Sequence, residues 1–233
     1  MKTLRTDGII LARTNYGEAD RILTMLTPRY GKLRLIAKGV RRQNSKLAGG
    51  IELFCISEIM FIQGRGDIGT IISSRLSKHF AMIAKDLERT MSAYVLIKRI
   101  DKATEDESEA DYFFLLEQAL TALNDASVET SMAVGVTELW FSAQLLTLAG
   151  YSPNLHSDKE GRELELSASY EFNLDSMSFR AVEGGDITDK HIKLLRLAFA
   201  KNTPQVLLRV AGIENLLPKI NPLIQDMFEA HIA

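Results

Sequence analysis

The residues of this chain that are best suited to chemistry are cations. No acidic residue occurs between Asp20 and Glu52, and the stretch AKGVRRQNSKLAG, residues 37–49, is the densest part of this gap. Eight Lys and Arg side chains lie in the gap: Arg21, Arg29, Lys32, Arg34, Lys38, Arg41, Arg42 and Lys46. Cations without interspersed acids favour binding of a polyanion, led by contacts to phosphate that are largely independent of sequence.

Enzymatic chemistry is poorly supported by the residues, and we expect no catalytic site. The chain has no G-x-x-x-x-G-K-[ST] stretch, which excludes a P-loop. His79, His156, His191 and His231 are far apart and lack the spacing of a metal site or a triad. The acidic stretch 104–111 is explained more simply as a solvated loop between helices than as a magnesium site.

The net charge of −2 conceals two opposed halves. Residues 1–78 carry a balance of +8 and residues 79–233 a balance of −10. This asymmetry indicates two domains with different partners, the first partner being a polyanion, although the two halves could instead attract each other within the fold. Cys55 lies in an apolar run, which predicts a buried thiol. Because no apolar stretch is long enough for a signal peptide or a membrane span, we expect a cytoplasmic protein without membrane contact.

The first eighty residues read as short strands separated by turn residues. The predicted strands cover residues 6–13, 21–27, 32–40, 51–63 and 68–80. The third alternates in places, with Leu33, Leu35 and Ala37 on one face and Lys32, Arg34 and Ile36 on the other. Five strands without a long helix between them predict an antiparallel barrel, with the five-stranded OB-fold as the candidate. Tyr16, in a turn, is the candidate for stacking on a base, whereas Tyr30, Phe54 and Phe61 are individually more typical of a core.

After residue 80 the hydrophobic period changes to that of helices. Helices are predicted over 81–103, 112–125, 128–153 and 186–200, and again from Pro204, with Trp140 in the core. Gly150 is the expected residue after a helix end and Thr188 an expected N-cap, while Pro218 and Pro222 should interrupt the last segment. Within a small insertion at about 152–185, residues 163–169 and 170–182 could form strands. The predicted fold class is therefore α+β, with an OB-fold barrel at 1–80 and an otherwise helical domain at 81–233.

Two stretches of the amino-terminal region resemble a known family. YGEADRILTMLTPRYGKLRLIAKGVRR and the following SKLAGGIELF are similar to the amino-terminal domain of RecO proteins, and the similarity continues less closely into DLERTMSAYVLIKRI and LLTLAGYSPNL. The resemblance implies a non-enzymatic mediator of DNA repair and recombination in the RecF pathway. Such proteins bind single- and double-stranded DNA and anneal complementary strands. They act with RecR and contact single-stranded DNA-binding protein (SSB), and thereby help to load RecA.

The resemblance also implies where the partners bind. The matching basic positions are Arg34, Lys38, Arg41, Arg42 and Lys46, to which Arg21 and Arg65 are added as DNA-contact candidates. An SSB tail, acidic with an apolar end, requires an apolar groove rimmed by cations. Lys190, Lys193 and Arg196 are offered as that rim.

The chain departs from the family in its insertion. Many relatives carry two C-x-x-C pairs after the GY-x-P segment, forming a zinc knuckle, but this region contains no cysteine. His156 alone cannot hold a structural zinc. We therefore expect no metal or other cofactor, with packing of Leu164, Leu166, Phe172 and Phe179 in its place.

Two other functions are compatible with the residues. An RNA-binding OB-fold protein of the translation machinery would carry a similar basic barrel. A protein-binding adaptor would use the basic patch to dock an acidic partner, and would not bind oligonucleotides at low salt.

Overall fold

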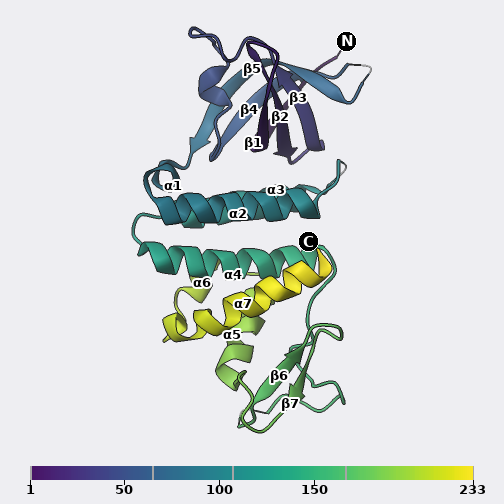
Figure 1. Cartoon of the computed structure of the whole chain (residues 1–233), viewed down its shortest axis with the longest axis vertical. Coiled ribbons are helices and arrows are strands. Elements are labelled where there is room, and N and C mark those ends of the chain that lie inside the picture. Colours follow the sequence, from purple (N-terminus) through teal and green to yellow (C-terminus); the bar gives the residue numbers. More distant parts are fainter. Residues whose placement is uncertain (1, 65, 107, 166, 233) are drawn as a thin grey trace. The chain divides into compact units, whose positions relative to one another are not determined.

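Five strands precede the first α-helix along this chain, a short hairpin follows the fourth α-helix, and the chain forms two compact units (Figure 1). The computed structural model describes residues 2–64, 66–106, 108–165 and 167–232. Unit 1 is Met1–Asn124 and unit 2 is Asp125–Ala233. The change from strands to helices falls at residue 80, between β5 and α1. No helix within the described ranges combines the length and the apolar character needed to cross a membrane.

Unit 1 begins with a closed five-stranded barrel, which confirms the predicted fold class. Its strands are β1 (Thr3–Tyr16), β2 (Asp20–Thr27), β3 (Gly31–Ala37), β4 (Cys55–Ile62) and β5 (Ile68–His79). Around the barrel the order is β1-β2-β3-β5-β4. Only the short β3–β5 pairing is parallel, and the other four pairings are antiparallel.

Strand β1 closes the barrel because it pairs on both sides. Thr3–Ile9 pairs with β4, and Ile9–Tyr16 pairs with β2. The register shifts between Ile10 and Ala12, and such an irregularity bends a strand and increases its twist. The bend lets one fourteen-residue strand leave the first partner and follow the second.

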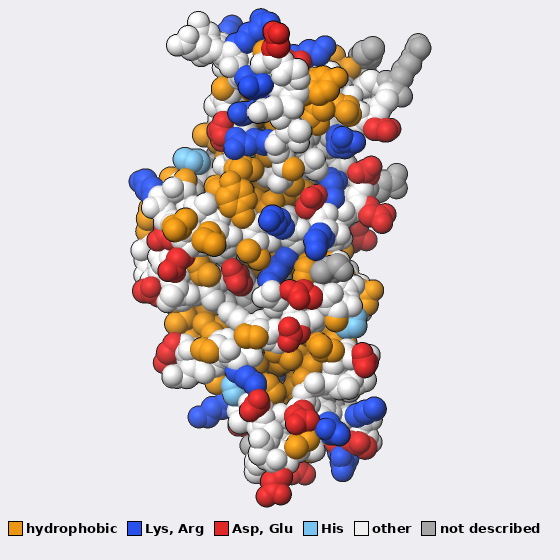
Figure 2. Space-filling view, viewed as in Figure 1, with side chains coloured by type: hydrophobic (Ala, Val, Ile, Leu, Met, Phe, Trp, Pro, Cys, Tyr) orange, Lys and Arg blue, Asp and Glu red, His pale blue; other side chains and the backbone are white. Residues whose placement is uncertain are grey.

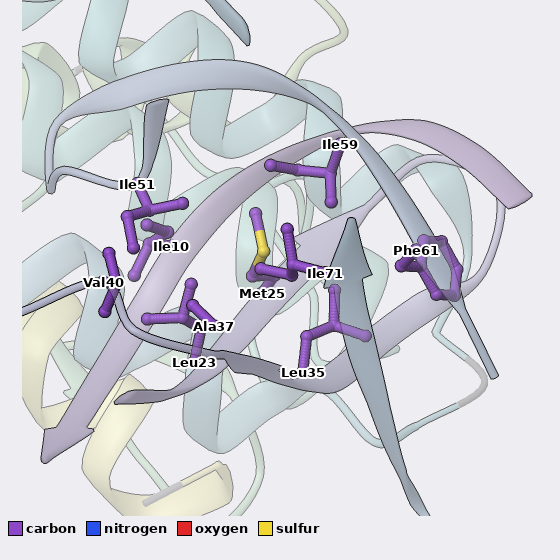
Figure 3. Packing of buried hydrophobic residues seen from close by; sticks show 10 residues of the cluster. All are labelled: Ile10, Leu23, Met25, Leu35, Ala37, Val40, Ile51, Ile59, Phe61 and Ile71. Atoms are coloured by element: carbon purple, nitrogen blue, oxygen red, sulfur yellow. The ribbon is translucent and has the colours of Figure 1, made fainter. Parts of the chain in front are cut away.

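The barrel interior is filled by hydrophobic side chains, most of them aliphatic, from all five strands and from the β3–β4 loop (Figure 3). The core members are Ile10, Leu23, Met25, Leu35, Ala37, Val40, Ile51, Ile59, Phe61 and Ile71. In β3 the alternation predicted from the sequence is present, since Leu35 and Ala37 are buried and Arg34 is exposed. The single cysteine, Cys55, is buried as predicted, and burial raises the pKa of its thiol.

Three helices complete unit 1: α1 (Ala81–Lys85), α2 (Leu87–Ala103) and α3 (Ala110–Leu123). The single helix predicted over 81–103 is wrong, because Asp86 leaves the helical conformation. Its extended backbone lets the Asp86 carboxylate accept a hydrogen bond from the N–H of Arg89, so Asp86 is the N-cap of α2. The buried Arg89 guanidinium donates to the carbonyl of Leu123 at the end of α3 and thereby joins the two helices.

The β2–β3 turn contacts the α2–α3 loop at close range. Gly31 has a φ of +60°, and a Cβ built on it would lie 2.2 Å from the Asp106 carbonyl oxygen. Next to it, the Lys32 N–H donates to that carbonyl oxygen over 3.0 Å. The Lys32 ammonium lies 2.9 Å from an oxygen of the Asp101 carboxylate. This contact holds the helical layer of unit 1 against the barrel.

Unit 2 contains four helices and one hairpin. These are α4 (Thr130–Leu148), β6 (Tyr170–Asn173), β7 (Ser178–Ala181), α5 (Asp189–Phe199), α6 (Pro204–Leu207) and α7 (Ile213–His231). Trp140 is buried in α4 as predicted, and its indole N–H donates to the Asn202 carbonyl. Gly150 follows the end of α4 with a φ of +85°, which confirms its predicted role.

Two predictions for unit 2 were wrong. Pro218 and Pro222 do not interrupt the last segment, because α7 runs from Ile213 to His231 with both prolines inside it. Residues 163–169 form no strand where the structure describes them, whereas the segment 170–182 contains the hairpin β6–β7. The N-cap at Thr188 and the helix start at Pro204 are both present.

The close approach at Gly31 generates a stability prediction. Gly31→Ala should lower the free energy of unfolding by about 3 kcal/mol, because left-handed strain and a backbone clash add. Gly17→Ala is the matched control, since Gly17 has a φ of +55° but no atom near its Cβ position, and should cost about 1 kcal/mol. Urea unfolding of both variants measures the difference. Equal losses of unfolding free energy in the two variants would show that the backbone at Asp106 shifts to accommodate the added methyl group.

Candidate nucleic-acid interface

The segment between β3 and β4, residues 38–54 and hereafter the basic loop, is anchored to the barrel by apolar side chains. Val40 and Ile51 belong to the barrel core and are 5% and 0% exposed. Leu47, Ala48 and Leu53 pack against the same core as partly buried side chains. The loop is therefore held at both ends and near its middle, and its polar side chains are left outside.

Consecutive turns give the basic loop a defined backbone. The N–H of Arg42 donates to the Gly39 carbonyl, and the N–H of Ser45 donates to the Arg42 carbonyl, each over 3.1 Å. The loop then enters a short 3₁₀ helix, η1 (Ala48–Gly50). Gly50 packs so closely on β5 that an added Cβ would lie 2.6 Å from the Ser74 hydroxyl oxygen. The Ser74 hydroxyl in turn donates to the Leu47 carbonyl.

Hydrogen bonds join the basic loop to the β1–β2 turn. The Gly39 N–H donates to the Asp20 carboxylate over 2.7 Å, and the Arg41 N–H donates to the Ala19 carbonyl over 2.9 Å. The Arg41 guanidinium also reaches the Gly17 carbonyl, at 3.3 Å. Two segments that are about twenty residues apart thus form one continuous surface at this end of the barrel, which we call the basic end.

Four cations of the basic loop remain available to a ligand. Lys38, Arg41, Arg42 and Lys46 are all exposed, and none forms an ion pair with any residue that the structure describes. Several other barrel cations are already neutralised, by the pairs Arg5–Glu58, Arg13–Glu52, Lys32–Asp101 and Lys78–Glu117. Figure 2 shows Lys and Arg side chains gathered on the barrel with few acidic ones among them. The uncompensated positive charge of the loop is therefore available to an anion.

The remaining DNA-contact candidates are placed differently. Arg21 lies at the basic end, where its guanidinium donates to the Asn15 side chain, but it is half-buried and therefore less accessible than the four exposed loop cations. Arg34 is exposed in the middle of β3, where it is paired with Thr24 of β2 and Ile68 of β5, on the barrel wall rather than in the loop. Arg65 lies outside the described residues.

Among the aromatic candidates only Tyr16 is free to stack on a base. It ends β1 directly before Gly17 and is 55% exposed. Tyr30 and Phe61 make an edge-to-face contact with each other, and Phe61 is buried. Phe54 is also buried, with its ring edge-on to Tyr94 of α2.

The proposed SSB-tail rim is only partly available. Lys193 pairs with Asp189, and the hydrogen bond from Lys193 lowers the pKa of that carboxyl. The Arg196 guanidinium donates to the Leu155 carbonyl. The Lys190 side chain is exposed and forms no ion pair with a described acid, although its charge helps to lower the pKa of the neighbouring Asp189 carboxyl. The rim stays a prediction.

The insertion of unit 2 does not provide the ligands of a zinc knuckle. It contains no cysteine, and His156 is exposed. No group of three or more His, Cys, Asp and Glu side chains suitable for a metal was found over the described ranges. Its core is aromatic, with Phe179 fully buried and its ring 5.0 Å from that of Phe172. These residues do not fit the zinc site of the family.

Comparison with known families covers both parts of the chain. The family model described as "Recombination protein O N terminal" matches residues 1–80, and the one described as "Recombination protein O C terminal" matches residues 84–231. The chain belongs to the RecO family. The resemblance read from the sequence is thus confirmed, and the match to the barrel region agrees with the OB-fold.

Curated relatives carry the name DNA repair protein RecO. One from Dehalococcoides mccartyi is 34% identical over 173 residues, which are 74% of this chain and 66% of that protein. One from a Roseiflexus species is 36% identical over 156 residues, 66% of this chain and 53% of that protein. One from Halalkalibacterium halodurans is 29% identical over 203 residues, 84% and 77% of the two chains. The matched region spans about half to two thirds of the first two RecO relatives.

Sequence reasoning missed the structural roles of two residues in the barrel of this RecO family member. Asp20 reads as an ordinary acid at the border of a basic stretch, yet its carboxylate fixes the backbone of the basic loop at Gly39. Lys32 belongs to the acid-free run but acts structurally, through Asp101. Nothing in the local pattern distinguishes Lys32 from Lys38, because the partner of Lys32 lies about seventy residues away.

The role of Asp20 can be tested by the sign of its effect on oligonucleotide binding. Asp20→Ala removes a negative charge, which by charge alone should tighten binding. We expect about threefold weaker binding instead, because the loop loses the hydrogen bond that holds it. Fluorescence titration measures the affinity, and faster hydrogen exchange at the Gly39 amide reports the loosened loop.

Glu18→Ala serves as the matched control for Asp20→Ala. Glu18 is an exposed acid of the same turn, with no polar partner among the described residues. Its removal should tighten binding slightly. If both variants tighten binding equally, Asp20 has no organising role.

Proposed function

We propose that this protein acts in DNA repair and recombination as a non-enzymatic mediator that binds single- and double-stranded DNA. The observation that carries the proposal is the basic loop, in which Lys38, Arg41, Arg42 and Lys46 are exposed and free of acidic partners on an anchored backbone. Phosphate contacts from Lys and Arg supply most of the affinity in sequence-independent binding. Membership of the RecO family supports the same conclusion.

The distribution of side chains favours a DNA path over the basic end rather than across the barrel wall. Outward positions on β2, β3 and β5 carry Ile22, Ile36, Ile68 and Ile72. The cations on these strands are separated: Arg34 and Arg75 are exposed on different strands, and Lys32 is paired with Asp101. This wall presents neither a row of cations nor stacking rings. The basic end provides four cations and one exposed ring, that of Tyr16.

Strand annealing follows from charge neutralisation. Two single strands repel each other through their phosphates, and cations that neutralise both lower this repulsion. Because binding through phosphates leaves the base edges free, strands held at the basic end can still pair. Because salt screens the attraction between distant charges, the cations must lie close to the phosphate backbones of both DNA strands. Their position in one loop keeps them close together.

The remaining roles proposed for this protein concern its partners. It would work with RecR and contact SSB, and so assist RecA loading on SSB-covered DNA at the nucleoid. Residues 79–233 carry a net charge of −10, which repels DNA and therefore favours protein partners for this part of the chain. Lys190, Lys193 and Arg196 remain the proposed rim for the SSB tail.

We further propose that this protein functions without zinc. Two observations support this proposal. The insertion contains no cysteine that could bind zinc, and the rings of Phe172 and Phe179 pack together within it. Elemental analysis of protein purified without added metal should find far less than one zinc per chain. A chelator should leave the unfolding midpoint unchanged, because no folding free energy comes from a metal. One zinc per chain, lost together with stability on chelation, would refute the proposal.

The electrostatic mechanism predicts a salt dependence. If about five cations contact single-strand phosphates, the slope of log K against log salt should be about −3.5. Arg41→Ala combined with Arg42→Ala should weaken binding to all sequences alike and reduce the slope by about 1.4. Fluorescence titration of a labelled oligonucleotide at several salt concentrations measures both quantities.

Matched controls separate this mechanism from its rivals. Arg5→Ala removes a barrel cation that is already paired with Glu58, and should leave the slope unchanged. A slope near zero for the unmodified protein would exclude phosphate binding and favour a protein-binding adaptor. Preference for an RNA competitor, without annealing of DNA strands, would favour a role in translation.

A further inference from the structure

Unit 2 contains a groove that the DNA-binding role does not use. It lies between the hairpin strand β6 and helix α7, and its volume is about 470 Å³. Figure 1 shows the hairpin at the end of unit 2 that is farther from α4. The apolar part of the lining is Phe172, Ile187, Pro218, Pro222 and Leu223. A groove of this size with an apolar lining and a few polar groups is typical of a ligand-binding site.

One edge of β6 carries backbone groups that no strand pairs with. Tyr170 exchanges both backbone hydrogen bonds with Ile187, so its N–H and C=O point away from β7. Since these directions alternate along a strand, the N–H and C=O of Phe172 point to the same outer edge. The register supports this, because Phe172 is paired with Phe179, whose carbonyl faces outward from β7 and accepts from Lys159. Phe172 therefore offers one donor and one acceptor beside the groove.

The charged groups of the groove favour a cationic ligand. Its lining includes the carboxylates of Glu171, Asp186 and Asp226 but only one cation, Lys219. Asp186 is paired with Lys219, and Glu171 is paired with Arg180 of the neighbouring strand. Asp226 is exposed and has no partner among the residues that the structure describes. One carboxylate thus remains for a cation.

The two prolines of α7 add hydrogen-bond acceptors to the same side. Pro222 has no N–H, so the carbonyl of Pro218 receives no bond from the following turn, and Pro218 frees the carbonyl of Glu214 in the same way. Both prolines line the groove. Within the groove lining, a guanidinium or an ammonium group can donate to the Pro218 carbonyl and to Asp226, whereas an acidic ligand can satisfy neither.

We propose that this groove binds an extended basic segment of a partner protein, which adds as a strand to the edge of β6 at Phe172. Alternate side chains of such a segment face opposite sides. Apolar ones enter the groove between Phe172 and Leu223, and a Lys or Arg side chain reaches Asp226. Backbone hydrogen bonds provide affinity and the side-chain sites provide specificity. The ligand is opposite in charge to an SSB tail and is independent of the DNA site.

The test uses the full chain and a short fluorescein-labelled peptide of alternating valine and arginine. Fluorescence anisotropy should show saturable binding. Exchange of the Phe172 amide proton should slow when the peptide is bound, because that N–H becomes hydrogen-bonded. The same peptide with N-methylated alternate amides on the strand-pairing edge should bind much more weakly. A peptide with glutamate in place of arginine should not bind.

Variants distinguish the groove from the general acidity of unit 2. Asp226→Lys should weaken peptide binding by about tenfold, because it places like charges together. Glu183→Lys makes the same charge change at an exposed position outside the groove lining and should leave binding unchanged. Equal weakening by both variants, or undiminished binding of the N-methylated peptide, would overturn the proposal. Self-association of the chain that Asp226→Lys abolishes would also overturn it, in favour of a second copy as the occupant.

Discussion

The basic end depends on the burial of two aliphatic side chains. Val40 and Ile51 complete the barrel core, and the ten-residue segment between the two positions is constrained by that fact. Without such anchors, a loop with four cations would spread through mutual repulsion and lose conformational entropy when a ligand ordered it. With them, the loop holds its cations on a defined backbone before any ligand arrives, so less ordering entropy is lost on binding.

The same barrel uses its other cations for a different purpose. Lys32 joins the β2–β3 turn to the α2 end through Asp101, and Lys78 reaches Glu117 of α3. These pairs hold the helices α1–α3 in one compact unit with the barrel, although the two family models meet near residue 80. The boundary between the two family models therefore differs from the boundary between the two compact units, which follows Asn124.

Most of the barrel could be predicted from the sequence, because alternation in β3 and the apolar run of β4 are local patterns. The exposure of Lys38, Arg41, Arg42 and Lys46 could be predicted for the same reason. The partners of Lys32 and Asp20 could not, since they depend on which distant segments meet in space. The continuity of α7 through Pro218 and Pro222 was also missed, because packing of Leu217, Ile220 and Ile224 offsets the lost helical hydrogen bonds.

Closure of the barrel by β1 has a consequence during synthesis. The first half of β1 pairs only with β4, so it has no partner until the ribosome has made residue 62. At about 5–20 residues per second, this interval lasts several seconds, during which an unpaired edge is a template for association with other chains. Arg5 and Asp7 lie in this half-strand and are exposed in the folded barrel. Charged side chains on an unpaired strand oppose such association, and these two are present throughout the interval.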